Sequence, residues 1–251
     1  MNGRSTSAGR HGDSLAATVK LCLESDDELE LGLQQVSGQE DPSMDKYWQR
    51  SKGPLARKVR RLRRAELPLD TARLACYLIG KTLVHNLPGG TVSGRIVETE
   101  AYVVGDRAGH AYCGRTPRNG ALYLERGHAY VYLIYGLHYL LNVTSERLGV
   151  GAGVLLRALE PLDGIALMRR GRGAVRLVDL ARGPGRLTDA LRIGSRHDGL
   201  DLCGGGPLWL GTARTPTGVI GRSERIGITK EAHRLLRFYE QGNPFVSGPN
   251  R

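Results

Sequence analysis

Two strand-like segments flank the turn Pro88-Gly89-Gly90, and this pattern constrains the fold more than any other feature of the chain. The first segment, KTLVHNL, is apolar and β-branched, and Pro and Gly are the residues that favour a reverse turn after it. The second segment, GRIVETEAY at 94–102, alternates in the manner of a half-buried strand. The chain is therefore expected to contain an antiparallel sheet.

Short strands and short helices are predicted for the rest of the domain. Asp70 is the expected N-cap of an apolar helix that ends at Gly80. Two strands joined at Gly136 are predicted for HAYVYLIYGLHYLLNVTSE, and further strands are predicted for VLLRALEP, RIGIT and LRFYEQ. Helices are predicted for DGIALMRRG and RGPGRLTDALRIG. Residues 103–120 and 195–221, rich in Gly, are expected to be irregular. Because no βαβ repeat occurs, we predict a single α+β domain with a mixed, mostly antiparallel curved sheet and surrounding helices.

The first 64 residues differ from the rest in composition. Residues 1–50 combine Ser, Gly, Asp, Glu and Gln with few aromatic side chains, which predicts disorder or weak helicity. Residues 51–64, SKGPLARKVRRLRR, form a basic linker; a solvated tether, a DNA-contacting arm and an import signal are all compatible with it. We therefore expect a disordered acidic extension and basic linker at 1–64 and a folded catalytic domain at 65–251.

Charge is unevenly distributed along the 251 residues. The net charge is +11, but residues 1–46 contain nine acidic and four basic residues, about −5, which leaves about +16 for the remainder. A body this basic attracts polyanions, and its excess of arginine over lysine suits bidentate phosphate contacts. Solubility alone is the alternative explanation, yet the charge favours a nucleic-acid partner.

Several classes of protein are disfavoured by what the sequence lacks. No apolar run approaches the roughly 18 residues of a membrane helix, and the N-terminus lacks the order of a signal peptide. We therefore expect an intracellular protein with no membrane partner. Four scattered cysteines without a CxxC motif argue against a structural zinc site or an iron–sulfur cluster. No metal or organic cofactor is predicted.

Glu98 and Glu100 are the strongest candidates for chemistry. Two positions apart on a strand, they point to the same face, with apolar or β-branched neighbours and Tyr102 beside them. A carboxylate at the end of such a strand is well placed to act as a general base, although a solvated pair of charges is the ordinary alternative. Arg157, inside the apolar run VLLRALEP, requires a carboxylate partner if it is buried. Glu98, Glu100 and Glu160 are the candidates.

Four tyrosines, at positions 130, 132, 135 and 139, lie in one stretch of ten residues inside the second predicted hairpin. Tyr130 and Tyr132 share a strand face, and Tyr135 immediately precedes the turn residue Gly136, where a side chain is usually exposed. Exposed aromatic rings on a basic body suit stacking on bases, which contributes about 1–3 kcal/mol per base. Core packing explains one or two of these rings.

The loop GRTPRNG offers polar groups to a phosphate backbone. Arg115 and Arg118 surround a turn, and Asn119 follows them. A turn with solvated arginines is nearly as good an explanation. His110, earlier in the same loop, is a candidate polar contact in a pocket, although a lone histidine is more often structural.

Six segments of the chain, in order, resemble those of the methylpurine-DNA glycosylases, also called the alkyladenine or 3-methyladenine DNA glycosylase family. The resemblance extends from about Leu67 to Ser247 and leaves the first 65 residues outside it. The segments are RIVETEAY, HAYCGRTPRN, YVYLIYGLHYLLNV, VLLRALEP, RGPGRLTDAL and LRFYEQGNPFVS. His138 and a shortened spacing between Tyr102 and His110 depart from the family pattern, which affects the shape of the pocket.

The resemblance implies a role for each matching residue. Glu100 would be the general base, and Arg157 with a backbone carbonyl near Ile226 would help hold the attacking water. Tyr135 would enter the minor groove. The residues implied to contact a flipped purine are Tyr102, His110, Tyr132 and Asn142.

The resemblance further implies base excision repair by a monofunctional glycosylase. Its substrates would be 3-methyladenine, 7-methylguanine and hypoxanthine in double-stranded DNA, with no cofactor, and the enzyme would be a monomer in the cytoplasm or nucleoid of a bacterium or the nucleus of a eukaryote. A non-catalytic nucleic-acid-binding module would explain the charge but not a carboxylate and an arginine at one pocket. An RNA-processing enzyme or nucleotide hydrolase would normally need a cluster of metal ligands.

Overall fold

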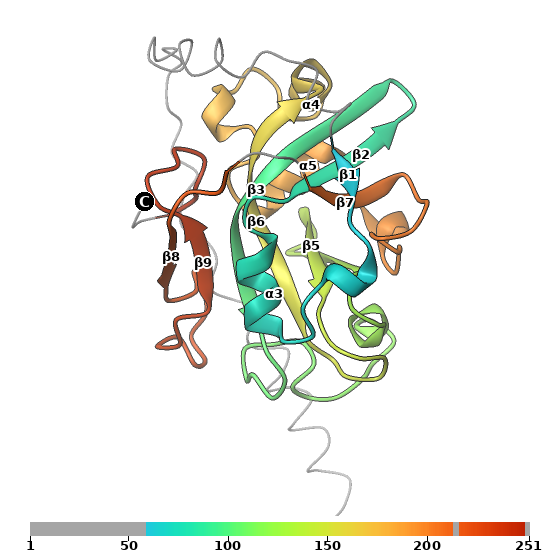
Figure 1. The fold of residues 1–251 in the computed structure, drawn as a ribbon, viewed down its shortest axis with the longest axis vertical. Helices are drawn as coiled ribbons and strands as arrows, with labels where there is room; N and C mark the ends of the chain where they lie inside the picture. The colour runs from blue at the N-terminus through green and yellow to red at the C-terminus, as the bar shows by residue number, and fades with distance from the viewer. Residues whose placement is uncertain (1–58, 213–215, 249–251) are drawn as a thin grey trace, which may run out of the picture.

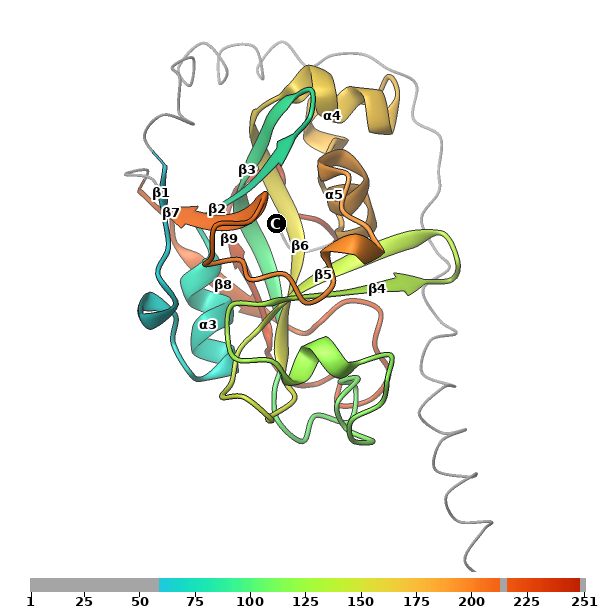
Figure 2. The same cartoon turned by 90° about the vertical axis from the view of Figure 1, so that its right-hand side faces the viewer.

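The computed structural model describes residues 59–212 and 216–248. It contains one curved antiparallel sheet with helices packed around it (Figures 1 and 2). The predicted α+β class is confirmed. The elements, with η for a 3-10 helix, are β1 (Arg60–Arg61), η3 (Arg64–Glu66), α3 (Thr71–Leu78), β2 (Thr82–Leu87), β3 (Gly90–Tyr102), η4 (Gly120–Tyr123), β4 (Ala129–Ile134), β5 (His138–Thr144), β6 (Gly153–Asp163), α4 (Ile165–Arg172), η5 (Leu177–Asp179), α5 (Pro184–Leu191), η6 (Ser195–His197), β7 (Leu208–Thr212), β8 (Ile220–Ser223) and β9 (Arg237–Glu240).

Strand β3 organises the sheet. The strand order is β1-β7-β2-β3-β6-β5-β4, and β9 pairs with both β3 and β8. The first half of β3 pairs with β2 and its second half with β9, whereas β6 pairs along the other edge. The part of β3 that carries Glu98 and Glu100 is thus enclosed by β6 and β9. Both carboxylates are completely buried as a result.

Local sequence signals define helix α3. Its N-cap is Asp70, whose side chain accepts a hydrogen bond from the backbone N of Arg73 at 2.7 Å, as predicted. The helix ends just before Gly80, which has a φ of +82° and lies so close to Thr217 that a Cβ would be 2.1 Å from its Oγ1. Only glycine fits this position.

Helices cover the sheet from different sides. In Figures 1 and 2, α3 lies on one side of β3 and β6, and the α4–α5 pair lies on the other. Leu74 and Leu78 of α3, and Leu187 and Leu191 of α5, are fully buried in the main apolar core. Removal of these side chains from water provides most of the drive for the packing.

Three expectations differ from the structure. RIGIT (225–229) is irregular, because the backbone N of Ile226 donates to a buried carboxylate instead of a neighbouring strand. Strand β7 lies in a segment expected to be irregular, and it pairs with β1 and β2. Residues 59–64, assigned to the linker, belong to the fold, since β1 joins the sheet and Leu62 is 1% exposed. The acidic extension lies outside the described residues.

Within the described ranges, none of the helices has both the length and the apolar character that crossing a bilayer requires.

Candidate active site

Arg157 of β6 joins the two carboxylates of β3. Its Nε lies 3.0 Å from Glu98 Oε1, and its Nη1 lies 3.2 Å from Glu100 Oε1. Two of the three carboxylates considered from sequence are therefore its partners, whereas Glu160 pairs with Arg95. Burial alone lowers the pKa of Arg157, but the charges of Glu100 and Glu98 outweigh this effect and raise its pKa above the usual value. The guanidinium stays charged.

The two carboxylates have different partners, and this difference distinguishes their roles. Glu98 also accepts from Arg237 Nε at 2.7 Å and from the backbone N of Ser247 at 2.7 Å, so two arginines share its charge. Glu100 pairs with only one arginine among the described residues, and its other donors are neutral: the backbone N of Ile226 at 2.8 Å and the hydroxyl of Tyr102 at 3.1 Å. Glu100 is therefore the less neutralised of the two.

Tyr102 connects Glu100 to a pocket with a volume of about 80 Å³. Glu100 itself does not line this pocket but lies directly behind Tyr102. Desolvation and the charge of Glu100 raise the pKa of Tyr102 well above its usual value, so the phenol remains protonated and donates. The other lining side chains come from the 103–120 loop, η4, β4, the β4–β5 turn, β5 and the 224–236 segment; they include Ala108, His110, Leu122, Tyr130, Tyr132, Ile134, Tyr135, Asn142 and Ile228.

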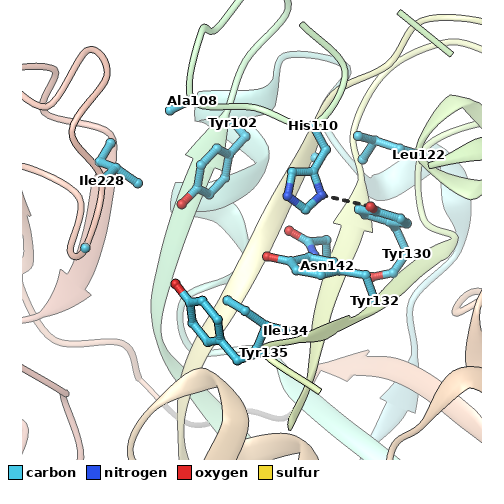
Figure 3. A pocket seen from close by; sticks show the side chains of 12 residues that line it. Tyr102, Ala108, His110, Leu122, Tyr130, Tyr132, Ile134, Tyr135, Asn142 and Ile228 are labelled. Carbon is cyan, nitrogen blue, oxygen red and sulfur yellow. Dashed lines mark hydrogen bonds between the residues drawn. The ribbon is translucent and has the colours of Figure 1, made fainter. Parts of the chain in front are cut away.

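Aromatic rings face one another across this pocket (Figure 3). Tyr102 and Ile228 form one side, and His110, Tyr130 and Tyr132 form the other. The His110 ring lies 4.5 Å from the Tyr132 ring, centroid to centroid, and its Nδ1 is 2.8 Å from the Tyr130 hydroxyl. Such walls are suited to a flat, electron-poor ligand that stacks between them.

Asn142 also lines the pocket. It lies on β5 in register with Tyr130 of β4, is 6% exposed, and donates from Nδ2 to the Tyr130 carbonyl oxygen at 3.4 Å. The structure thus brings Glu100, Arg157 and all four predicted base-binding residues to one place.

Tyr135 lies at the tip of the β4–β5 hairpin, which projects from the body (Figure 2). Tyr135 and Gly136 have φ values of +51° and +67°, the signs required at both central residues of a type I′ turn. A positive φ is uncommon for a bulky residue and costs about 1–3 kcal/mol. The turn holds the ring at the mouth of the pocket, with 45% of the residue exposed.

The predicted phosphate-binding loop divides into surface and buried residues. Arg115 and Arg118 are exposed, and Arg118 Nη2 donates to the carbonyl oxygen of Leu133 at 3.3 Å. Asn119 is only 4% exposed, and its amide donates to the carbonyl oxygens of His110 and Gly114. Its side chain holds the loop together and is not presented at the surface.

The comparison with known protein families agrees with this geometry. The sequence model described as methylpurine-DNA glycosylase (MPG) matches residues 65–244. The chain belongs to the methylpurine-DNA glycosylase family. It is therefore a DNA glycosylase, a hydrolase of DNA repair whose substrate is DNA.

Individual relatives of this glycosylase cover the same domain. A protein of Mesorhizobium japonicum is 68% identical over 74% of this chain and 89% of its own length. A protein of Paraburkholderia phytofirmans is 55% identical over 76% of this chain and 89% of its own length. A protein of Methanoculleus marisnigri is 46% identical over 71% of this chain and 94% of its own length. Each carries the provisional name 3-methyladenine DNA glycosylase.

Some residues that line the pocket were not among the predicted site residues. Tyr130 shares a strand face with Tyr132, as the alternation of β4 predicts, but the sequence did not assign it a contact with the base. No sequence signal indicated that Ile228 lines the pocket, because RIGIT was expected to form an ordinary strand. His138 lies outside the pocket, with Nδ1 3.1 Å from Asp189 Oδ2. Across residues 59–212 and 216–248, no group of three or more His, Cys, Asp or Glu is arranged to hold a metal ion.

Proposed function

We propose that this protein is a monofunctional glycosylase that hydrolyses the N-glycosidic bond of alkylated or deaminated purines after base flipping. Substrates of the 3-methyladenine, 7-methylguanine and hypoxanthine type are included. The observation that carries the proposal is the buried pair Glu100–Arg157 directly behind an aromatic pocket. The names of the relatives support 3-methyladenine as one substrate.

Base flipping follows from the shape of the site. A base paired inside a duplex cannot reach a narrow pocket, so the nucleotide must leave the stack at a cost of a few kcal/mol. That cost is smaller where damage weakens pairing. Tyr135, exposed at the hairpin tip, is in position to fill the space that the nucleotide vacates.

The aromatic pocket favours cationic purines. Alkylation at N3 or N7 gives the purine a positive charge, and the faces of Tyr102 and Tyr132 attract a cation. Asn142 lies where it could crowd the exocyclic amine of a normal guanine. Hypoxanthine is neutral, so its departure would also require protonation of the base.

Glu100 would activate the attacking water. Water adds to the sugar C1′ and gives a proton to the carboxylate, while the N-glycosidic bond breaks and its electron pair leaves with the purine. A cationic purine thereby leaves neutral. The same carboxylate stabilises the positive charge that develops on the sugar, as in glycoside hydrolysis, and Arg157 keeps it in place.

Strand cleavage is not part of the proposed activity. A lyase would need an amine to form a Schiff base with the sugar. Lys81 and Lys230 are the lysines of the described ranges, and neither lines the pocket.

An excision assay on a panel of lesion duplexes tests the proposal. Purified protein, acting as a monomer, should release 3-methyladenine, 7-methylguanine and hypoxanthine in the presence of EDTA. Strand breaks should appear only after alkali treatment. Failure to release any damaged purine would contradict the proposed function. Strand breaks that appear without alkali would contradict the monofunctional character, and a stable dimer in light scattering would contradict the monomeric state.

Tyr135→Ala is expected to weaken binding to lesion-containing duplex DNA. Loss of one stacking ring corresponds to about 1–3 kcal/mol, roughly 5- to 150-fold in Kd. Fluorescence of 2-aminopurine beside the lesion would report the loss of flipping. Tyr77→Ala on α3, on the other side of the sheet, is the control. Wild-type binding by Tyr135→Ala would mean that the ring only packs against its neighbours.

Replacing both Arg115 and Arg118 with serine is expected to reduce the salt dependence of DNA binding. Each phosphate contact contributes roughly one unit to the slope of log K against log salt concentration, so the slope should fall by about two. The measurement is a Kd titration at several salt concentrations. Arg73→Ser, an exposed arginine on α3, should leave the slope unchanged. An unchanged slope in the double variant would remove these two arginines from the interface.

A further inference from the structure

Arg225 lies behind the pocket and forms a buried ion pair. Its side chain and that of Asp106 are both completely inaccessible to solvent. Nη1 and Nη2 donate to the Asp106 carboxylate, and Nη1 also donates to the carbonyl oxygen of Ala101 at 3.1 Å. Its Nε is buried without an acceptor among the described residues. Such pairs often stabilise a fold no more than well-packed apolar side chains do, so stability alone does not account for it.

The guanidinium of Arg225 also packs on Tyr102. Its central carbon lies 4.7 Å from the centroid of the ring. Tyr102 lines the pocket and Arg225 does not, so the guanidinium supports the ring from behind. A fixed ring is what stacking on a flipped base requires.

Both neutral donors to Glu100 are anchored at Arg225. The N–H that approaches Oε1 belongs to Ile226, the next residue along the chain. The hydroxyl that approaches Oε2 belongs to Tyr102, the ring on which the guanidinium packs. The orientation of the Glu100 carboxylate therefore depends on where Arg225 is held.

The same ion pair reaches the opposite wall of the pocket. Asp106 Oδ1 accepts from the backbone N of Ala108 at 3.0 Å, and its carbonyl oxygen accepts from Gly109 N, immediately before His110. The loop that carries His110 is thus tied to the segment that carries Ile226.

We infer that Arg225 is a positioning residue for Glu100: it fixes the two neutral donors that orient the catalytic carboxylate and joins both walls of the pocket. The inference rests on the proposed function. It predicts that loss of the guanidinium affects the chemical step more than the binding of DNA.

Arg225→Met tests this separation. A displacement of about 1 Å at a reacting group costs roughly 100-fold in rate, so single-turnover excision of 3-methyladenine should slow by about that factor. The Kd for a duplex containing a tetrahydrofuran abasic-site analogue should stay within about threefold, since Arg225 does not line the pocket. Arg225→Lys, which keeps a charge opposite Asp106, should recover part of the rate. Rates are normalised to active enzyme titrated with the analogue.

Two controls separate positioning from folding. The double variant Asp106→Asn/Arg225→Met leaves no unpaired buried charge, so it should fold and still excise slowly. Arg95→Met removes a buried arginine that pairs with Glu160 and Glu240 away from the pocket. It should lower Tm, yet the folded enzyme should keep its excision rate.

Three results would overturn the inference: excision by Arg225→Met within threefold of wild type, equal losses in rate and in DNA binding, or the same slowing in Arg95→Met. If Arg225→Met fails to fold, a wild-type rate in the double variant would overturn it. A wild-type protein that excises no lesion would instead contradict the proposed function, so the two failures can be told apart.

Discussion

Glu100→Gln is expected to slow excision of 3-methyladenine about 10³-fold, within the range that general acid–base catalysis contributes. The glutamine keeps the shape of the side chain and a carbonyl oxygen for the Ile226 N–H, but it cannot take a proton from water. Binding to damaged DNA should persist, because the pocket walls are unchanged. Single-turnover excision and Kd on the same duplex measure both effects.

A buried carboxylate elsewhere provides the matched control. Glu240 is 7% exposed and pairs with Arg95, outside the pocket. Glu240→Gln should lose some stability and keep the excision rate per folded molecule. Unchanged excision by Glu100→Gln would refute Glu100 as the base and direct attention to Glu98.

Arg157→Met is expected to destabilise the fold by about 3–5 kcal/mol, the usual result of breaking a buried ion pair from one side. Glu98 keeps Arg237 as a partner, but Glu100 would keep only its neutral donors among the described residues. Excision should also be lost, because the carboxylate is no longer held. Urea unfolding measures the first effect, and the excision rate below the unfolding transition measures the second.

An exposed ion pair provides the contrast to Arg157→Met. The Arg60 side chain is 55% exposed and pairs with Glu66, and solvent screens such surface pairs so that they contribute little to stability. Arg60→Met should therefore change stability little. A loss below about 1 kcal/mol in Arg157→Met would mean that the buried pair is energetically no different from this surface pair.

Local signals explain the parts of the fold that could be predicted. The cap at Asp70, the turn after Leu87 and the alternation of 94–102 each act within a few residues, and each corresponds to an observed element. RIGIT failed as a strand because its residues satisfy a strand pattern locally, yet the Ile226 N–H is used by a carboxylate 126 residues away. No local pattern records such a partner.

The site shows the same division. A single buried arginine in VLLRALEP was enough to expect a carboxylate partner, because an unpaired buried charge is too costly. That Arg157 bridges both Glu98 and Glu100 was not derivable, since it depends on the pairing of β3 with β6. Asn119 could not be placed either, because its loop folds back on its own side chain.

The sequence by itself determined the fold class, the family, and the candidate set that includes Glu100. Alternation and capping act over short range, so they need no knowledge of the rest of the chain. Only the tertiary structure decided which carboxylate is less neutralised. Arg237 and Ser247 from the C-terminal segment use the oxygens of Glu98, and Tyr102 leaves Glu100 beside the pocket. Those partners are brought together by the antiparallel pairing of β6 and β9 with β3, which joins strands that are far apart in the sequence.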